Sequence, residues 1–295
     1  MHAIVIGHGK VGRELVSQLH RLGYGTTVVT SHNKNLYPST LPSANIVFIC
    51  MPSRGSGNEA FNYIKAAHLL KIPVVTCEKA ALTWHFKELY EQKNLLGWSS
   101  TVGGGSCLLR ALQPDLPIRD ISGIINATFT HLFSCKQPLA EGIKLALQAG
   151  TMETGNLTTG KCLNVELTDI LLKLCILFNT AQLGHINPSH LTFDCYDPAL
   201  VEATAPTGEW RCCISINRDR QPFHPEFIYG YQQGWHIQAG IQKQFQQCVG
   251  AGNLLRVNYC SGQSFQVEGP GAGPIPTAAA MILDAQRLLS PATKP

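Results

Sequence analysis

The first two dozen residues constrain the fold more than any other stretch of the chain. Ala3–Ile6 is a short apolar run, and Gly7, Gly9 and Gly12 follow it with the spacing G-x-G-x-x-G, where the helical pattern Val11–Leu22 begins. In such a turn the first glycine permits a sharp bend, the second lets a pyrophosphate approach the backbone, and the third lets helix and strand pack closely. The helix N-terminus then faces the phosphates. A strand, this glycine turn and a helix in succession predict a dinucleotide-binding domain, and a purely structural turn is the weaker alternative.

Apolar runs and helical patterns then alternate along the first half of the chain. Strands are predicted at Tyr24–Thr30, Ala44–Met51, Ile72–Cys77 and Gly97–Val102, and Ile121–Thr130 continues the pattern. This alternation predicts an α/β fold with a Rossmann-type doubly wound parallel sheet, which binds ligands at the carboxyl ends of its strands. We expect residues 1–132 to form this domain. Glu78 and Lys79 directly follow one such strand end, which makes Lys79 a candidate site residue, although an ordinary loop lysine is the alternative.

The loop after the second predicted strand bears on the choice of cofactor. NAD-binding domains place an acidic residue there for the ribose 2′-hydroxyl. This chain has Ser31, His32, Asn33 and Lys34 instead. No carboxylate is present there to repel a 2′-phosphate, and the Ser31 hydroxyl and the Lys34 ammonium can bind such a phosphate. The loop therefore favours NADP, although NAD stays possible and the same composition suits an ordinary solvated turn.

A charged pair lies within an apolar helical stretch, Glu166–Phe178. Asp169 and Lys173 are four residues apart and share one helix face, but leucine and isoleucine flank that face on both sides. A helix that is apolar all round is normally buried. One interpretation is an ordinary surface ion pair, which stabilises by only about 0.3–0.5 kcal/mol. The other is a catalytic lysine that lines a cleft and whose proton affinity is adjusted by burial and by Asp169.

Composition excludes several classes of protein. Of 295 residues only 14% are charged, and the net charge of +4 comes from dispersed Lys and Arg without a basic run, so no nucleic acid partner is expected. The N-terminus begins directly with a strand pattern and no apolar run has membrane-spanning length, which predicts a cytoplasmic protein without a membrane partner. The 11 cysteines are scattered through apolar runs, which favours reduced thiols over a metal site or disulfides.

Several further motifs, taken in order, resemble those of the homoserine dehydrogenase family. TCEKAAL at 76–82 resembles T-A-N-K-A-L, TVGGGSC at 101–107 resembles S-V-G-G-G-I-P, and GIINATFTHLF at 123–133 resembles G-I-L-N-G-T-T-N-Y-I. Glu153 matches the glutamate of G-Y-A-E, and Asp169 and Lys173 match D-x-x-x-K. GPGAGPIPTAAAMILD at 269–284 resembles the family's C-terminal return to the first domain.

The resemblance implies roles for particular residues. Lys173 would transfer the proton, held by Asp169, and Lys79 would be a second cation near the reacting oxygen. Glu153, Asn164 and Thr128 would bind the substrate, with Glu153 at its ammonium group. The positions implied for the cofactor are Gly7, Gly9, Lys10, Val11, Gly12, Ser31, Lys34, Lys79, Gly103, Gly104, Asn126, Gly271 and Gly273.

The chain also departs from the family pattern. Cys107 replaces a proline, Ala127 a glycine, and Asn164 an aspartate that binds substrate in the family, and the segment between Glu153 and Asp169 is longer. These changes lie around the substrate positions more than around the cofactor positions. They leave the substrate open and the dehydrogenase architecture intact.

Residues 185–265 match the family least. Short runs at Leu191–Cys195, Arg211–Asn217, Phe227–Tyr231 and Leu254–Tyr259 predict strands between turns. We expect residues 133–267 to form a mixed α+β domain for substrate binding and, by resemblance, for dimerisation into a homodimer. Residues 268–295 should return as a helix that packs on the nucleotide domain, with no regulatory module after it.

The resulting expectation is an NADP-preferring dehydrogenase that acts on a CH–OH group. By resemblance, its substrates would be L-homoserine and aspartate semialdehyde, in threonine and methionine biosynthesis. One rival is a dehydrogenase of the same architecture for another small amino or hydroxy acid. A second is a catalytically idle NADP-binding sensor, which would need only the glycine turn and not also Lys79, Glu153, Asp169 and Lys173.

Overall fold

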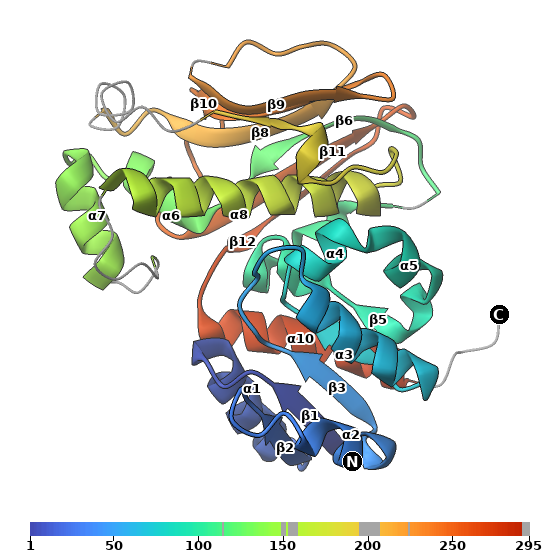
Figure 1. Ribbon diagram of the computed structural model, residues 1–295. Coiled ribbons are helices and arrows are strands. Elements are labelled where there is room, and N and C mark those ends of the chain that lie inside the picture. The colour runs from blue at the N-terminus through green and yellow to red at the C-terminus, as the bar shows by residue number, and fades with distance from the viewer. Residues whose placement is uncertain (114, 149–151, 153–158, 195–206, 224, 291–295) are drawn as a thin grey trace. The chain divides into compact units, whose positions relative to one another are not determined.

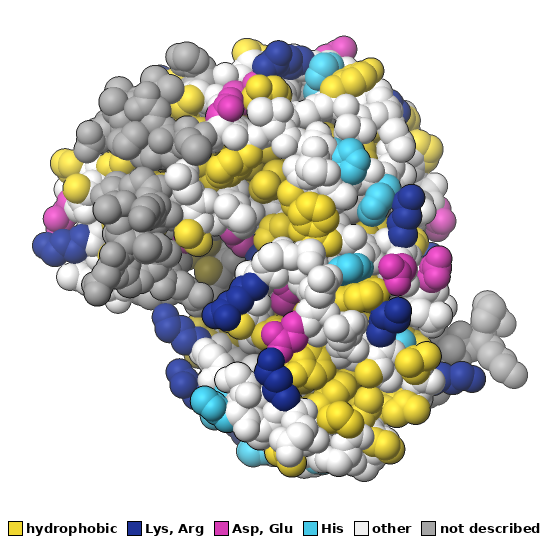
Figure 2. Space-filling view, in the orientation of Figure 1, with side chains coloured by type: hydrophobic (Ala, Val, Ile, Leu, Met, Phe, Trp, Pro, Cys, Tyr) yellow, Lys and Arg dark blue, Asp and Glu magenta, His cyan; other side chains and the backbone are white. Residues whose placement is uncertain are grey.

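The chain folds into two compact units in the computed structural model (Figure 1). The model describes residues 1–295 except 114, 149–151, 153–158, 195–206, 224 and 291–295, and it does not describe the side chains of 159–162. One unit comprises residues 1–105 and 273–295, and the other comprises residues 106–272. Lys and Arg side chains are scattered over the face of each unit that Figure 2 shows.

The first unit contains a five-stranded parallel sheet, which confirms the predicted fold class. In spatial order its strands are β2 (Gly25–Val29), β1 (His2–Ile6), β3 (Ile46–Ile49), β4 (Val74–Thr76) and β5 (Leu96–Gly97). The sequential strands β2 and β3 lie on opposite sides of β1. In open α/β sheets such a reversal of strand order leaves a crevice at the carboxyl ends, where ligands bind.

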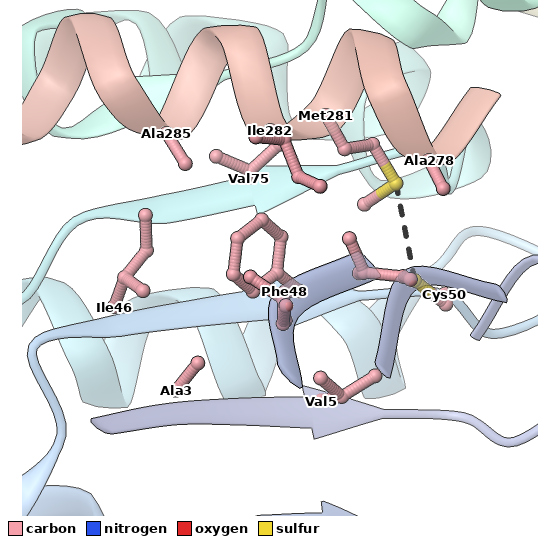
Figure 3. Close-up of a cluster of buried hydrophobic side chains, with 12 residues drawn as sticks. Ala3, Val5, Ile46, Phe48, Cys50, Val75, Ala278, Met281, Ile282 and Ala285 are labelled. Carbon is pink, nitrogen blue, oxygen red and sulfur yellow. Dashed lines mark hydrogen bonds between the residues drawn. The ribbon is translucent and has the colours of Figure 1, made fainter. Parts of the chain in front are cut away.

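The helices of this unit are α1 (Lys10–Arg21), α2 (Leu36–Thr40), α3 (Asn58–Leu69), α4 (Ala80–Trp84), α5 (Phe86–Glu91) and α10 (Pro274–Leu289). The C-terminal α10 supplies Ala278, Met281, Ile282 and Ala285 to the core over β1, β3 and β4, as Figure 3 shows. The Cys50 thiol donates a 3.9 Å hydrogen bond to the Met281 sulfur. The two ends of the chain therefore share one hydrophobic core.

The strand predicted at Gly97–Val102 is wrong beyond its first residue. β5 ends at Gly97, and Ser99–Thr101 forms a 3₁₀ turn instead. The Ser99 N–H donates to Asp284 Oδ2 of α10 at 2.8 Å. In a longer strand this N–H would instead donate to the backbone of a neighbouring strand.

The second unit contains a seven-stranded sheet in the order β12-β11-β6-β8-β10-β9-β7, in which every recorded pairing is antiparallel. The strands are β6 (Ile118–Ile124), β7 (Thr192–Phe193), β8 (Arg211–Asn217), β9 (Glu226–Gln232), β10 (Trp235–Gln242), β11 (Gly252–Tyr259) and β12 (Ser264–Pro270). The second domain predicted from the sequence is therefore built on an antiparallel sheet. β10 and β12 were not predicted from the sequence, since glutamine, histidine and glycine interrupt their apolar pattern.

The described part of the second unit also contains the helices α6 (Ala127–Ser134), α7 (Leu139–Gln148) and α8 (Thr159–Thr180). α6 packs against β8 and β11. The guanidinium of the buried Arg211 of β8 donates to the carbonyl of Phe133, near the end of α6, at 3.4 Å. It also donates to the carbonyl of Cys248 at 2.7 Å, and so links α6 to the segment before β11. None of the helices in the described part of the chain has the length and hydropathy that crossing a membrane requires.

The boundaries between the units differ from those expected from sequence. We expected changes after residues 132 and 267, whereas the compact units change after Gly105 and Ala272. The first difference has a simple cause. β6 pairs with β11 and β8 of the antiparallel sheet and not with the parallel sheet. The alternation of strands and helices in the sequence suggested a continuing α/β pattern, but it does not specify which strand each strand pairs with.

Replacing Gly12 with Ala should destabilise the first unit. A Cβ at this position would lie 2.2 Å from the Gly7 carbonyl oxygen, whereas a Cβ at Gly9 would meet nothing within 4 Å. Because the backbone must shift to relieve the overlap, we expect the free energy of unfolding of G12A to fall by roughly 1–3 kcal/mol. G9A is the matched control and should stay within about 0.5 kcal/mol of the parent. Urea denaturation followed by circular dichroism measures both, and equal stabilities would contradict the packing role of Gly12.

Candidate active site

The three glycines of the N-terminal turn have different surroundings. Gly7 has a φ of +101°, and a Cβ there would lie 2.5 Å from the Cys50 carbonyl oxygen, so the turn needs glycine for conformation and for space. Gly12 packs onto Gly7, as described above. At Gly9 the space is open, at the N-terminus of α1. A phosphate could approach the backbone there, which is the role that the sequence predicted for this position. The adjoining Lys10 is exposed and Val11 half-buried.

The loop after β2 is organised by Asn33. Its Oδ1 accepts hydrogen bonds from the Thr30 N–H at 2.6 Å and the Thr30 hydroxyl at 3.0 Å, and its Nδ2 donates to the Val28 carbonyl at 3.1 Å. Ser31 is exposed, and the half-exposed Lys34 forms an ion pair with Glu59 of α3. The Glu59 hydrogen bond raises the pKa of Lys34. The structure thus brings to Lys34 a carboxylate that the local sequence did not reveal.

Lys79 follows β4 and precedes α4, as predicted for a strand-end residue. Its backbone N–H donates to Ser53 Oγ at 2.8 Å. The neighbouring Glu78 is 1% exposed and accepts from the N–H groups of Ala80 and Ala81 at 2.7 and 2.8 Å, so that its carboxylate caps the start of α4. Burial raises the pKa of Glu78, although these N–H bonds oppose the shift. Glu78 therefore fixes the backbone from which the Lys79 side chain extends.

The remaining predicted cofactor glycines lie in backbone conformations or spaces that favour glycine. Gly103, Gly104 and Gly273 have φ values of +84°, +52° and +112°. A Cβ at Gly271 would lie 2.3 Å from the side chain of the fully buried Asn253. Gly103 and Gly104 belong to the first unit, whereas Gly271 lies one residue before the end of the second and Gly273 begins the return to the first.

In the second unit, Lys173 is a buried cation on α8. It is 7% exposed, and its ammonium lies 2.6 Å from Asp169 Oδ2 and donates to the Ile125 carbonyl at 2.7 Å. The surface ion-pair interpretation is therefore wrong. An ammonium has three N–H donors, so these two partners leave one donor for another group. The Ile125 carbonyl belongs to the junction of β6 and α6, which ties α8 to that junction.

Asn126 connects this ion pair to a second carboxylate. Its Oδ1 accepts from the Phe129 N–H at 2.8 Å and caps α6, which orients its amide. The amide Nδ2 then donates to Glu166 Oε2 at 2.8 Å and to Asp169 Oδ2 at 3.1 Å. The resulting cluster joins two helices through one side chain.

Glu166 is the residue of this cluster that sequence reasoning missed as a site residue. Burial raises the pKa of its carboxyl, and the Asp169 charge raises it further. Hydrogen bonds from Asn126 and Thr128 and the charge of Lys173 act in the opposite direction. A signal was present in the sequence, since residues 166, 169 and 173 follow the i, i+3, i+7 spacing of one helix face.

Some of the predicted site residues lie together in the structure, and others do not. The structure brings Asn126, Thr128, Asp169 and Lys173 together in the second unit. Asn164, half-buried, lies on α8 five residues before Asp169, and Glu153 lies outside the described residues. Among the described residues no group of three His, Cys, Asp or Glu side chains could hold a metal ion, and the nine described cysteines are free.

A hollow of about 370 Å³ lies elsewhere on the second unit. It is lined mainly by polar side chains of β6, of β8 and of the segment after β8, among them Arg119, Asp120, Arg218 and Asp219. The Arg218 guanidinium lies 3.9 Å from the centre of the Trp235 ring. None of the predicted site residues lines this hollow.

Comparison with solved structures identifies the architecture. A homoserine dehydrogenase from Thiobacillus denitrificans superposes with a TM-score of 0.72 at 17% identity, over 98% of this chain and 73% of that one. One from Thermoplasma acidophilum gives 0.70 at 16% identity, over 97% and 98%. A hyperthermophilic archaeal homoserine dehydrogenase mutant in complex with NADPH gives 0.69 at 17% identity, over 99% of both chains. The chain has the homoserine dehydrogenase fold.

The similarity to homoserine dehydrogenases covers both units, including residues 185–265, where the sequence motifs are weakest. No protein-family model matches the chain, and no curated protein matches it by sequence. At 16–17% identity the three-dimensional likeness establishes the fold, and the chemistry has to be argued from the site residues themselves.

Replacing Asn126 with Asp should destabilise the second unit at neutral pH. The exchange keeps an oxygen that can cap α6 but removes the N–H donors and adds a third carboxylate beside Glu166 and Asp169. We expect the free energy of unfolding at pH 7 to fall by about 1–3 kcal/mol, since buried acceptors lose their donor. The loss should shrink as the pH is lowered, because protonation relieves the repulsion between carboxylates.

Asn126→Ala is the comparison for this experiment, since it removes the cap without adding charge. Its loss of stability should not depend on pH in this way. Urea denaturation at pH 5 and pH 7 distinguishes the two variants, and an N126D loss that is the same at both pH values would contradict the bridging role of the amide.

Proposed function

We propose that the chain is an NAD(P)-dependent oxidoreductase that transfers a hydride between a nicotinamide and a small amino-acid alcohol or its aldehyde. L-Homoserine and aspartate semialdehyde are the first candidates for this pair. The observation that carries the proposal is the buried Lys173, held by Asp169 and the Ile125 carbonyl on a homoserine dehydrogenase fold. An NADPH complex of a protein with this fold supports a nicotinamide cofactor.

The residues present suit such a cofactor. The open space at Gly9 and the α1 N-terminus would receive the pyrophosphate, and Ser31 and Lys34 would meet the adenosine ribose. The bound cofactor would supply or accept the hydride. The chain would bind and orient both reactants and exclude water from them.

Lys173 would move the proton. Alcohol oxidation requires a group that takes the hydroxyl proton as the hydride leaves, and aldehyde reduction requires the same group to return it. In aldehyde reduction the ammonium would give the proton that Asp169 and Ile125 leave available to the substrate oxygen, and in alcohol oxidation the neutral amine would take that proton from the hydroxyl group. Asp169 would act by orienting Lys173. By resemblance, Lys79 is proposed as a second cation near that oxygen, and Glu153 and Thr128 as substrate-binding residues.

A panel of amino alcohols and hydroxy acids, each supplied with NADP and with NAD, tests the proposal. Oxidation of L-homoserine with the appearance of reduced nicotinamide absorbance would support it. Turnover of a different member of the panel would favour the rival dehydrogenase, and no turnover at all would favour the idle sensor. The homodimer, the biosynthetic pathway and the cytoplasmic location stay predictions.

Replacing Lys173 with Met should lower kcat by roughly 10²- to 10⁴-fold, because it deletes the proton carrier but keeps the length and apolar character of the stem. Cofactor affinity should stay nearly unchanged. Asp169→Asn should reduce kcat less, since Asp169 orients the ammonium without carrying the proton. Steady-state kinetics and cofactor titration measure these quantities.

Lys144→Met is the matched control, because Lys144 is an exposed lysine of α7 in the same unit and pairs with Glu141 at the surface. It should leave kcat unchanged. The double variant D169N/K173M separates loss of chemistry from the cost of an unpaired buried carboxylate. If K173M keeps most of its kcat, Lys79 becomes the better candidate for proton transfer.

NADPH should bind more tightly than NADH, because Ser31 and Lys34 can contact a 2′-phosphate. The Lys34–Glu59 ion pair sharpens this prediction, since the phosphate must share Lys34 with a carboxylate. Glu59→Gln should therefore tighten NADPH binding by a few-fold at low salt, and Lys34→Ala should weaken it by a similar factor. Neither change should affect NADH. Fluorescence titration with both reduced cofactors tests this, and equal or tighter binding of NADH to the parent would contradict it.

A further inference from the structure

The geometry of α8 separates two candidate positions for contact with the substrate. Successive helical residues rotate by about 100°, so position 164 lies about 180° from Lys173 around the helix axis, whereas Glu166 lies within about 20° of it. The helix is continuous from Thr159 to Thr180, so both positions obey this rotation. The family resemblance assigned substrate contact to Asn164. The side of α8 that carries the proposed proton carrier instead presents Glu166.

Two carboxylates, those of Glu166 and Asp169, lie on this side of α8. Within the described residues, the charged groups that act on the Glu166 carboxylate are those of Asp169 and Lys173. Two carboxylates and one ammonium of α8 thus lie on this side of the helix in a half-buried to buried setting. Like charges that are partly removed from water repel strongly, and an added cation relieves that repulsion.

Glu166 also has acceptor capacity left. A carboxylate can accept about four hydrogen bonds, and the recorded donors to Glu166 are Asn126 at 2.8 Å and Thr128. Both donors belong to the β6–α6 junction and its first helical turn, so they hold the carboxylate in place. Asn126 donates amide N–H groups to both Glu166 and Asp169. Because its amide is uncharged, it neutralises neither carboxylate.

We infer that Glu166 binds the ammonium group of the substrate and thereby selects amino acids over hydroxy acids. The inference rests on the proposed function, which places the reacting oxygen at Lys173. A chain of three contacts links Glu166 to Lys173. Glu166 and Asp169 each accept a hydrogen bond from Asn126, and Asp169 forms the ion pair with Lys173. A ligand that contacts both must carry its cation only a few bonds from its hydroxyl group, as a small amino alcohol does. Glu166 would take the place of the family aspartate that Asn164 replaces, and would bind the ammonium beside Glu153, for which the resemblance implies the same contact.

Glu166→Gln tests this inference, because it removes the charge and keeps the shape. With L-homoserine, KM should rise roughly 10- to 100-fold, as expected when one hydrogen bond to a charged group is lost, while kcat stays within a few-fold because Lys173 is intact. With 4-hydroxybutyrate, which lacks the ammonium, KM should not change. The parent should therefore prefer L-homoserine over 4-hydroxybutyrate, and E166Q should lose most of that preference. A residue with a purely structural role would move both substrates alike.

Glu141→Gln is the control for loss of a negative charge from the same unit, since Glu141 lies on the surface of α7. Should E166Q not fold, Glu166→Asp retains the charge at a shorter reach and should raise KM for L-homoserine alone by a smaller factor. Unchanged discrimination in these variants would overturn the inference. A rise in KM in Asn164→Ala with none in E166Q would also overturn it, in favour of position 164.

Equilibrium binding measurements distinguish a failure of the Glu166 inference from a failure of the proposed function. If the parent does not oxidise L-homoserine with either cofactor, the proposed function fails, and calorimetric titration with L-homoserine and 4-hydroxybutyrate still tests Glu166. Tighter binding of L-homoserine to the parent, lost in E166Q, would support the inference by itself. Equal binding of the two compounds to the parent would overturn it.

Discussion

The burial of the Lys173 ammonium is the interaction around which the second unit is arranged. An ammonium withdrawn from water costs several kcal/mol unless charges and acceptors compensate it. Here compensation comes from Asp169 one turn away on the same helix and from the Ile125 carbonyl at the end of β6. The second contact holds α8 against the β6–α6 junction. The same requirement that stabilises the fold therefore also positions the candidate proton carrier.

Asn126 extends this arrangement because each of its polar atoms has a separate partner. Its oxygen caps α6, and its amide bridges Glu166 and Asp169. A single side chain thereby couples the start of one helix to the polar face of another. These contacts hold two carboxylates and one ammonium in fixed positions on the polar face of α8.

The first unit depends on close backbone packing instead. Gly7 and Gly12 allow α1, β1 and the end of β3 to approach one another without Cβ atoms, and this leaves the α1 N-terminus next to the open space at Gly9. The C-terminal helix α10 covers the same sheet with small and apolar side chains (Figure 3). The glycine turn thus lies on a core built from both ends of the sequence.

The sequence alone determined the features that arise from local spacing: the glycine turn between strand and helix, the parallel strands, and the shared face of Asp169 and Lys173. Each depends on residues within one or two turns or strands of each other, where periodicity has a single structural meaning. Only the tertiary structure decided the partners of these elements. The pairing of β6 in the antiparallel sheet, the Glu59 partner of Lys34 and the cluster around Glu166 join residues at least 25 positions apart. No local pattern encodes such contacts, because they depend on which distant segments of the chain folding brings together.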